Sequence, residues 1–249
     1  MFIESRNNKI YREALELKEK NARDQKGLFL VEGKKQISEI DGGWRARALF
    51  VSKDYKGTVP ENSFVLPPKL FDKLSSTKTP QGIIAAVEKR VYDAQEILRQ
   101  NGFFLILENI QDPGNLGAII RSAHAFGAKG VFISKGSADI YSSKAARSTM
   151  GSIFKVPFIN DIDCRDIMKI MKQEKIQTLA ASLKGKDLSQ MPAFKGKIAL
   201  IIGNEGGGIQ EETERASDFC VKIQMKGGAQ SLNAAAAASI IMYELSKNT

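Results

Sequence analysis

The residues that build disulfide frameworks and metal sites are scarce in this chain. Its 249 residues include two cysteines and one histidine. Cys164 and Cys220 have no metal-ligand spacing and no histidine beside them. We therefore expect neither a disulfide framework nor a metal site, and the unpaired thiols favour a cytoplasmic protein.

A long hydrophobic run is also lacking. The most apolar stretch, residues 232–245, is shorter than the roughly 20 residues that span a bilayer, and it contains Asn233 and Glu244. Residues 1–6 do not contain the apolar segment of a secretory signal. We therefore expect no membrane partner.

The composition is that of a folded protein with a basic surface. Apolar residues make up 43% of the chain, which is too much for a disordered one. The net charge of +9 divides almost evenly, with +5 in residues 1–100 and +4 in residues 101–249. Such an excess fits a partner rich in phosphates. The alternative is that the charge only keeps the protein soluble.

The hydrophobic pattern predicts two domains, and the first covers residues 1–95. Short apolar runs bounded by polar residues indicate strands, and apolar residues at helical spacing indicate helices. The expected strands are 28–31, 48–51, 64–66 and 83–87, and the expected helices are 8–23, 34–40 and 69–74. A polar helix at 92–100 then leads to Asn101-Gly102, where we place the boundary.

The second domain, residues 101–249, has stronger strands that alternate with helices. We expect strands at 103–107, 131–133, 179–181, 198–202 and 220–223, and helices at 115–126, 143–149, 163–175, 210–216 and 232–246. Several of these strands are apolar on both faces, which is typical of a mostly parallel sheet with helices on both sides. The sequence therefore predicts an α/β fold with its ligand site beyond the carboxyl ends of the strands.

The first of three polar segments that follow strands is 108–121. Asp112-Pro113-Gly114-Asn115 is turn chemistry, and Gly114 or Asn115 is a candidate start for the next helix. Arg121 is expected within the first two turns of that helix, pointing into a shared cleft. The alternative is an ordinary strand–turn–helix with a surface arginine.

The second segment, 201–209, has four glycines in six positions, from Gly203 to Gly208. Glycines let a ligand or another backbone approach closely. The segment lacks the Lys-Ser or Lys-Thr of a phosphate-binding loop, and the Glu205 carboxylate would repel a phosphate. A cationic cofactor, or one recognised through backbone groups, fits better. The alternative is a tight structural turn.

The third segment, 223–233, precedes an alanine-rich helix. Ser231 is well placed to cap that helix, which is the structural alternative to a functional role. Asn233 is unfavourable in a first helical turn, so we expect its side chain to have a specific task.

In their order and spacing the three segments resemble the three motifs of the SpoU/TrmH class of SPOUT RNA methyltransferases. The matching residues are Asn109, Asp112-Pro113-Gly114-Asn115, Gly117 and Arg121, then Ile202-Gly203-Asn204-Glu205-Gly206 and Gly208, then Met225, Gly227 and Ser231-Leu232-Asn233. Leu30-Val31-Glu32-Gly33 and Thr79-Pro80-Gln81-Gly82 resemble the ribosomal-protein-like RNA-binding domain that precedes many of these enzymes. One departure is Gln224, where the family often has Pro, which puts the shape of the cofactor loop in doubt.

The resemblance implies S-adenosylmethionine-dependent methyl transfer to a ribose 2′-hydroxyl of RNA. Ribosomal RNA of the large subunit is favoured over transfer RNA, because the N-terminal domain resembles that of rRNA-directed members. It further implies a C-terminal trefoil knot and a homodimer with the catalytic arginine near the subunit interface. The residues carried over to the cofactor pocket are Gly203, Ile223, Met225 and Leu232.

The resemblance also implies catalytic roles for five residues. Arginine stays protonated in proteins, so we expect Arg121 to anchor the adjacent phosphate and stabilise alkoxide charge rather than act as a base. Asn109 and Glu205 would orient Arg121 and the ribose, and Ser231 and Asn233 would fix the loop and the target. His124, the one histidine, is expected to be a partly buried structural residue.

Three other functions remain open at this point. One is a catalytically silent RNA-binding or ribosome-assembly protein on the same scaffold. Another is a methyltransferase directed at transfer RNA. The third is a nucleotide-dependent oxidoreductase that uses the glycines of residues 203–208, against which Glu205 and the absence of an early dinucleotide motif argue.

Overall fold

The chain folds into two compact units. The computed structural model describes residues 1–191 and 196–247. Unit 1 contains Met1–Arg90 together with Asp139–Phe154, and unit 2 contains Val91–Ala138 and Lys155–Thr249. The segment 139–154 therefore belongs to unit 1, although its place in the sequence falls inside the expected domain 101–249. Within the described residues, no helix is long and apolar enough to cross a membrane.

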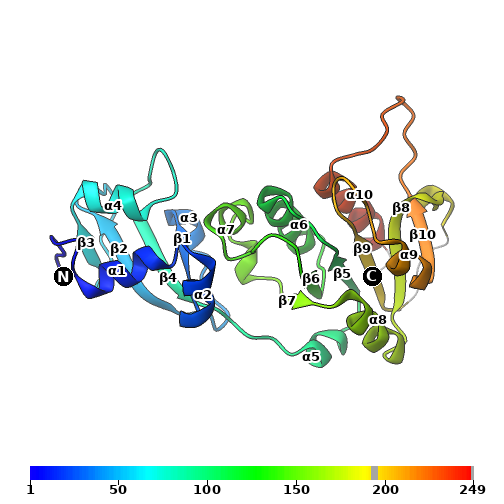
Figure 1. Ribbon diagram of the computed structural model, residues 1–249, viewed down its shortest axis with the longest axis horizontal. Helices are drawn as coiled ribbons and strands as arrows, with labels where there is room; N and C mark the ends of the chain where they lie inside the picture. The colour runs from blue at the N-terminus through cyan, green and yellow to red at the C-terminus, as the bar shows by residue number, and fades with distance from the viewer. Residues whose placement is uncertain (192–195, 248–249) are drawn as a thin grey trace. The chain divides into compact units, whose positions relative to one another are not determined.

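Unit 1 is built on a four-stranded sheet in the order β1-β4-β2-β3 (Figure 1). β4 pairs antiparallel with both β1 and β2, and β3 pairs parallel with β2. The strands are β1 (Leu28–Glu32), β2 (Ala46–Ser52), β3 (Phe64–Leu66) and β4 (Ile83–Glu88). The helices are α1 (Lys9–Glu16), α2 (Lys20–Lys26), α3 (Lys34–Ile37), α4 (Pro68–Leu74), α7 (Ser143–Ser148) and the 3-10 turn η1 (Ser152–Phe154).

The single helix expected over residues 8–23 is wrong, because the chain forms α1 and α2 with a break between them. The break leaves the carbonyls of Leu17 and Lys18 without helical partners. The Arg23 guanidinium donates to both, at 2.9 Å and 2.6 Å. A buried side chain five and six residues further along the chain thus stabilises a break that helical periodicity alone does not reveal.

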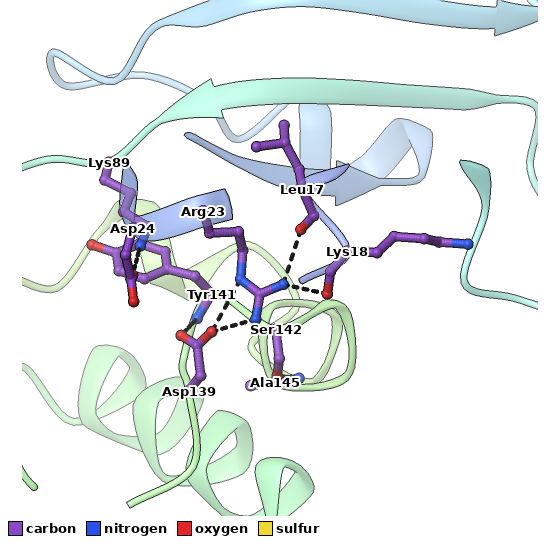
Figure 2. Close-up of polar contacts among 9 residues, drawn as sticks. All are labelled: Leu17, Lys18, Arg23, Asp24, Lys89, Asp139, Tyr141, Ser142 and Ala145. Carbon is purple, nitrogen blue, oxygen red and sulfur yellow. Dashed lines mark hydrogen bonds and ion pairs between the residues drawn. The ribbon is translucent and has the colours of Figure 1, made fainter. Parts of the chain in front are cut away.

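Segment 139–154 completes the core of unit 1. Arg23 forms an ion pair with Asp139, with 2.6 Å between Nη2 and Oδ2 (Figure 2). The Phe29 ring lies 4.9 Å from that of Tyr141, and the Trp44 ring lies 5.3 Å from that of Phe154 between centroids. All four aromatic side chains are buried, so the hydrophobic contacts that hold this segment are extensive.

Unit 2 is built on a six-stranded sheet in the order β10-β8-β9-β5-β6-β7, and every pairing in it is parallel. The strands are β5 (Phe103–Leu107), β6 (Gly130–Ser134), β7 (Phe158–Ile162), β8 (Gln177–Asp187), β9 (Ile198–Ile202) and β10 (Phe219–Lys222). This confirms the expected α/β fold with a parallel sheet. β7 was not predicted, because polar residues 160–161 interrupt its apolar pattern at the edge of the sheet.

Helices cover both faces of this sheet (Figure 1). They are α5 (Ala94–Leu98), α6 (Pro113–Ala125), α8 (Cys164–Gln173), α9 (Glu211–Ala216) and α10 (Ala234–Ser246), with the 3-10 turn η2 (Leu188–Gln190). α5 and α8 pack against Phe104 and Ile106 of β5 in one buried cluster. Alternate strand residues point to opposite faces, and on the other face α10 contacts α6 and β9.

The excess positive charge is unevenly divided between the two units. Unit 1 has 20 Lys and Arg against 13 Asp and Glu, a net charge of +7. Unit 2 has 17 against 15, a net charge of +2. The even division by sequence halves therefore does not describe the folded protein, in which most of the excess lies on the smaller unit.

Candidate active site

The first two polar segments meet at the carboxyl ends of β5 and β9, which are neighbours in the sheet. The Glu108 N–H donates to the Ile202 carbonyl at 2.8 Å. The Asn204 side chain then donates to the Asn109 carbonyl at 2.9 Å. Asn109 has a φ of +57°, a left-handed conformation that asparagine tolerates better than most residues, and it turns the chain out of the strand.

The glycine loop that follows β9 is a compact turn. Asn204 and Gly208 exchange two backbone hydrogen bonds, each 2.9 Å long. The Asn204 side-chain oxygen accepts from the N–H groups of Gly206 and Gly207 at 2.8 Å and 3.0 Å. A Cβ on Gly203 would lie 2.2 Å from the carbonyl carbon of Gly208. Only glycine therefore fits at 203, so that position has a structural role in addition to any contact with a ligand.

A cavity of about 690 Å³ opens beside this loop. It is lined by residues of β8, the glycine loop, the loop after β10 and α10. Its lining includes all four residues expected to hold the cofactor, Gly203, Ile223, Met225 and Leu232, together with the predicted catalytic residues Glu205 and Ser231. Residues of the second and third segments therefore share one cavity, whereas its lining includes no residue of the first segment, 108–121.

The lining of this cavity fits S-adenosylmethionine. Its walls include the apolar side chains Ile202, Ile209, Val221 and Ile241, which suit an adenine ring. Glu205, Glu211 and Glu214 also line it, against Lys184 and Lys222. This acidic balance favours a ligand with positive charge, as the sulfonium and amino groups of the donor carry.

A side-chain network joins the three segments at the glycine loop. The Asn115 amide donates to Glu205 Oε1 at 2.8 Å. The Asn233 amide donates to Asn115 Oδ1 at 2.9 Å. Asn115 is thus the link between the other two, a role that its place in the turn and at the expected start of the helix did not indicate. Its signal is an amide in the first turn of a helix that begins beside the glycine loop.

The helix caps differ from those expected. Asp112 caps α6, because its carboxylate accepts from the Asn115 N–H at 2.9 Å. Asn233 caps α10 by accepting from the N–H groups of residues 235 and 236, so Ser231 as the cap is wrong. A capping side chain must lie directly before the first helical turn. Ser231 is two residues too early, and it lines the cavity instead.

Arg121 does not join this network. It is exposed on α6, and it makes no side-chain hydrogen bond or ion pair with any residue in the ranges 1–191 and 196–247. It lies eight residues after Pro113, about 12 Å along the helix, and it does not line the cavity. His124 is exposed, so its expected partial burial is wrong. Asn109 contributes its backbone to the site, and no hydrogen bond joins its side chain to Arg121 or Glu205.

Glu108 is a second residue that the sequence analysis missed. The residue is 3% exposed, and its carboxylate accepts from the Gln210 N–H at 2.7 Å and from Thr213 Oγ1 at 2.5 Å. These bonds hold the chain at the end of the glycine loop. Burial, together with the charge of Glu108, raises the pKa of the nearby Cys164 thiol to about 12, so this thiol stays protonated at neutral pH.

Comparison with known proteins identifies both parts of the chain. Residues 102–243 match the model of the SpoU rRNA methylase family, and residues 7–85 match an MRM3-like substrate-binding domain. A 23S rRNA (uridine(2479)-2′-O)-methyltransferase of Streptomyces viridochromogenes is 31% identical over 97% of this chain and 90% of its own length. A 23S rRNA (guanosine(2553)-2′-O)-methyltransferase of Bacillus subtilis is 29% identical over 98% of both.

Solved structures of two relatives contain the methyl donor. The SpoU methyltransferase AviRb from Streptomyces viridochromogenes in complex with AdoMet has a TM-score of 0.85 at 29% identity, covering 97% of this chain and 98% of that one. AdoMet-bound rRNA methyltransferase from Sinorhizobium meliloti has a TM-score of 0.88 at 27% identity, covering 99% and 97%. From its motifs, its fold and these matches, the chain belongs to the SpoU rRNA methylase family.

Proposed function

We propose that this protein transfers a methyl group from S-adenosylmethionine to a ribose 2′-hydroxyl of large-subunit ribosomal RNA. The observation that carries the proposal is the acidic, partly apolar cavity, whose lining residue Glu205 is bonded to Asn115 and through it to Asn233. Two relatives that span nearly the whole chain carry 23S rRNA 2′-O-methyltransferase names, which supports the substrate class. Free Cys164 and Cys220 support a cytoplasmic location.

The residues that line the cavity would bind the cofactor. Gly203, Ile223, Met225 and Leu232 would hold the adenosine part, largely through backbone groups. When bound, S-adenosylmethionine supplies a methyl group already activated by its sulfonium. A ribose hydroxyl is a weak nucleophile, so the protein must orient it and help it to lose its proton.

Arg121 is the residue we assign to that second task. Its guanidinium has no partner among the described residues, so it is free to bind a phosphate of the RNA in bidentate fashion. There it would stabilise the charge that develops on the ribose oxygen, while a phosphate oxygen or water takes the proton. Glu205, held by Asn115, and Asn233 would orient the ribose. Ser231 would fix the loop after β10, and Asn109 would fix the turn that precedes α6.

A second copy of the chain belongs to this proposal. Ile240 and Tyr243 of α10 are 40% and 51% exposed, and Tyr243 lies against Phe126 after α6, with ring centroids 5.9 Å apart. This apolar face supports a homodimer that would bring Arg121 of one protomer toward the cavity of the other. We further propose that the loops after β9 and β10 form the trefoil knot expected of the family.

The test is methyl transfer from labelled S-adenosylmethionine to large-subunit rRNA that lacks ribose methylation. Arg121→Lys is expected to lose most of the turnover while the calorimetric Kd for S-adenosylmethionine stays unchanged, because lysine keeps the charge but not the bidentate fork. Arg165→Lys, an exposed change on α8, serves as control. Near-normal turnover of Arg121→Lys contradicts the bidentate role.

The same measurements separate the competing functions. A silent RNA-binding scaffold would release no heat with S-adenosylmethionine. An enzyme directed at transfer RNA would bind the donor but label tRNA in preference to rRNA. Binding of NAD in its place would indicate an oxidoreductase.

A further inference from the structure

Unit 1 contains a groove that none of the residues discussed for catalysis enters. Its volume is about 640 Å³. It is lined by Lys34, Ser52, Asp54, Tyr55, Lys56, Gly57, Pro68, Phe71, Asp72, Pro80, Gln81 and Gly82. These residues come from the ends of β2 and the starts of α3, α4 and β4, so the fold gathers four separate segments around it.

The Tyr55 ring is held in a fixed position on this groove. The Tyr55 N–H donates to the Ser52 carbonyl at 2.9 Å in a turn that follows β2. A Cβ on Gly57 would lie 2.5 Å from the ring, and one on Gly82 would lie 3.1 Å from it. The ring therefore lies against two glycines, where larger residues would displace it. Its hydroxyl makes no hydrogen bond within the part of the chain that the structure describes.

Another part of the groove lining is also fixed by hydrogen bonds. The Gln81 side-chain oxygen accepts from the Lys34 N–H at 3.0 Å. The preceding loop is held by Glu32, whose carboxylate accepts from the N–H of Ser76 at 3.0 Å and from the hydroxyl of Thr77 at 2.8 Å. A groove whose lining is anchored at these places is preformed for a ligand.

The charge around the groove favours an anionic ligand. The segments that line it, 34–35, 52–57, 68–73 and 80–82, carry six lysines and two aspartates. Of the lysines, Lys34 and Lys56 line the groove and the other four lie beside it in the sequence. All six lysines are exposed. The two aspartates, Asp54 and Asp72, line the groove itself, where their carboxylates can accept from the amino groups of a base. The unit as a whole has a net charge of +7.

We propose that this groove binds an unpaired nucleotide of the RNA substrate, with the base stacked on Tyr55 and flanking phosphates beside Lys34 and Lys56. An aromatic ring that shares a groove with basic side chains suits single-stranded RNA, since the base stacks while the cations follow the backbone. The bases of a duplex are already stacked and cannot reach the ring. The inference rests on the proposed function, because it assigns the RNA a specific place on unit 1.

The test measures binding of the full-length protein to two labelled probes. One is a 12-nucleotide RNA designed without self-pairing, and the other is a 12-base-pair RNA duplex. Tyr55→Leu is expected to weaken binding of the single strand about tenfold, within the range for loss of one stacked base, and to leave duplex binding unchanged. Tyr55→Phe should bind as the parent protein does, because stacking needs the ring and not the hydroxyl.

Two further variants test the charge. Lys34→Ala and Lys56→Ala are each expected to lower the salt dependence of single-strand binding by about 0.7 in the slope of log K against log salt. The matched controls lie outside the groove. Phe2→Leu removes an aromatic ring that is 70% exposed, and Lys20→Ala removes an exposed lysine of α2. Neither should change affinity for the single strand by more than about twofold.

Two outcomes would contradict the proposed nucleotide site. If Tyr55→Leu binds the single strand as tightly as Tyr55→Phe, or if both probes weaken equally, the groove is not the nucleotide site. Fluorescence of the single tryptophan, Trp44, which lies in unit 1, shows whether a variant is folded. Methylation of rRNA by the unaltered protein is measured separately, so a failure of the proposed function is distinguished from a failure of this inference.

Discussion

Arg23 and Asp139 are 116 residues apart in the chain, and they form an ion pair buried in the core of unit 1. The side chains are 6% and 14% exposed. Both the Nε and Nη2 groups of Arg23 donate to Asp139 Oδ2, at 3.0 Å and 2.6 Å. The pair fastens segment 139–154 to α2, so residues that interrupt the part of the sequence matching the SpoU family stabilise unit 1.

Asp139→Ala is expected to destabilise unit 1 by about 3–5 kcal/mol, because it leaves the Arg23 guanidinium buried without a counter-charge. Urea unfolding followed by the fluorescence of Trp44 measures the change, since this is the single tryptophan of the chain. Arg47→Ala is the control. Its pair with Glu88 joins side chains that are 66% and 38% exposed, and its loss should cost less than about 1 kcal/mol. Equal losses in the two variants would contradict the assigned role.

Glu32 predicts a pH-dependent contribution to the stability of unit 1. Burial by itself would raise the pKa of Glu32, but hydrogen bonds from Ser75, Ser76 and Thr77 bring it below its ordinary value of 4.5. A lowered pKa means that the ionised carboxylate stabilises the fold above about pH 4.5 and that this contribution is lost as the pH falls through the folded-state pKa.

Glu32→Gln is therefore expected to lower the free energy of unfolding at pH 7 by about 1 kcal/mol, and the difference from the parent should shrink as the pH falls below 4.5. Urea unfolding across this range checks the prediction. Glu61→Gln changes an exposed carboxylate of the same unit and should show no such trend. A difference that persists at low pH would mean that shape rather than charge matters at Glu32.

Replacing Gly203 tests how closely the backbone at this position approaches that of Gly208 in the glycine loop. The alanine Cβ of Gly203→Ala would lie 2.2 Å from backbone atoms of Gly208, so we expect unit 2 to lose about 1–3 kcal/mol and S-adenosylmethionine binding to fall below detection. Gly207→Ala is the matched variant, because a Cβ there meets no atom within 4 Å, and it should leave thermal stability unchanged. Calorimetry and thermal melts measure both effects. A stable Gly203→Ala protein that binds the donor would overturn this reading of the loop.

Glu108 is expected to hold the end of the glycine loop in position through its hydrogen bonds to Gln210 and Thr213. Glu108→Gln replaces an acceptor of the Gln210 N–H or of the Thr213 hydroxyl with a donor, and we predict a Kd for S-adenosylmethionine about tenfold higher, equivalent to about 1.4 kcal/mol. Asp218→Asn is the control, because Asp218 accepts two bonds from Thr178 in the same unit but does not line the cavity. Its Kd should not change. If both variants bind the donor equally well, Glu108 has only a structural role.

The residues that line the candidate site could be predicted from the sequence, whereas the hydrogen bonds between its side chains could not. Apolar strands followed by polar turns indicated which segments would meet, because parallel strands place their carboxyl ends at one edge of a sheet. Gly203, Met225 and Leu232 accordingly line the cavity. The role of Asn115 was not predictable, since its bonds to Glu205 and Asn233 join side chains 90 and 118 residues apart. Arg121 lies outside the network because its place along α6 carries it away from the loop.

The sequence by itself determined the alternation of strands and helices, the parallel sheet and the three polar segments, since these follow from local periodicity, turn chemistry and burial on both strand faces. Tertiary structure alone decided that residues 139–154 join unit 1 and that most of the excess charge lies there. It also decided that Arg23, beside the break between α1 and α2, is buried against Asp139, 116 residues away. Long-range packing sets such outcomes, because a buried charge takes whichever partner the fold brings within reach.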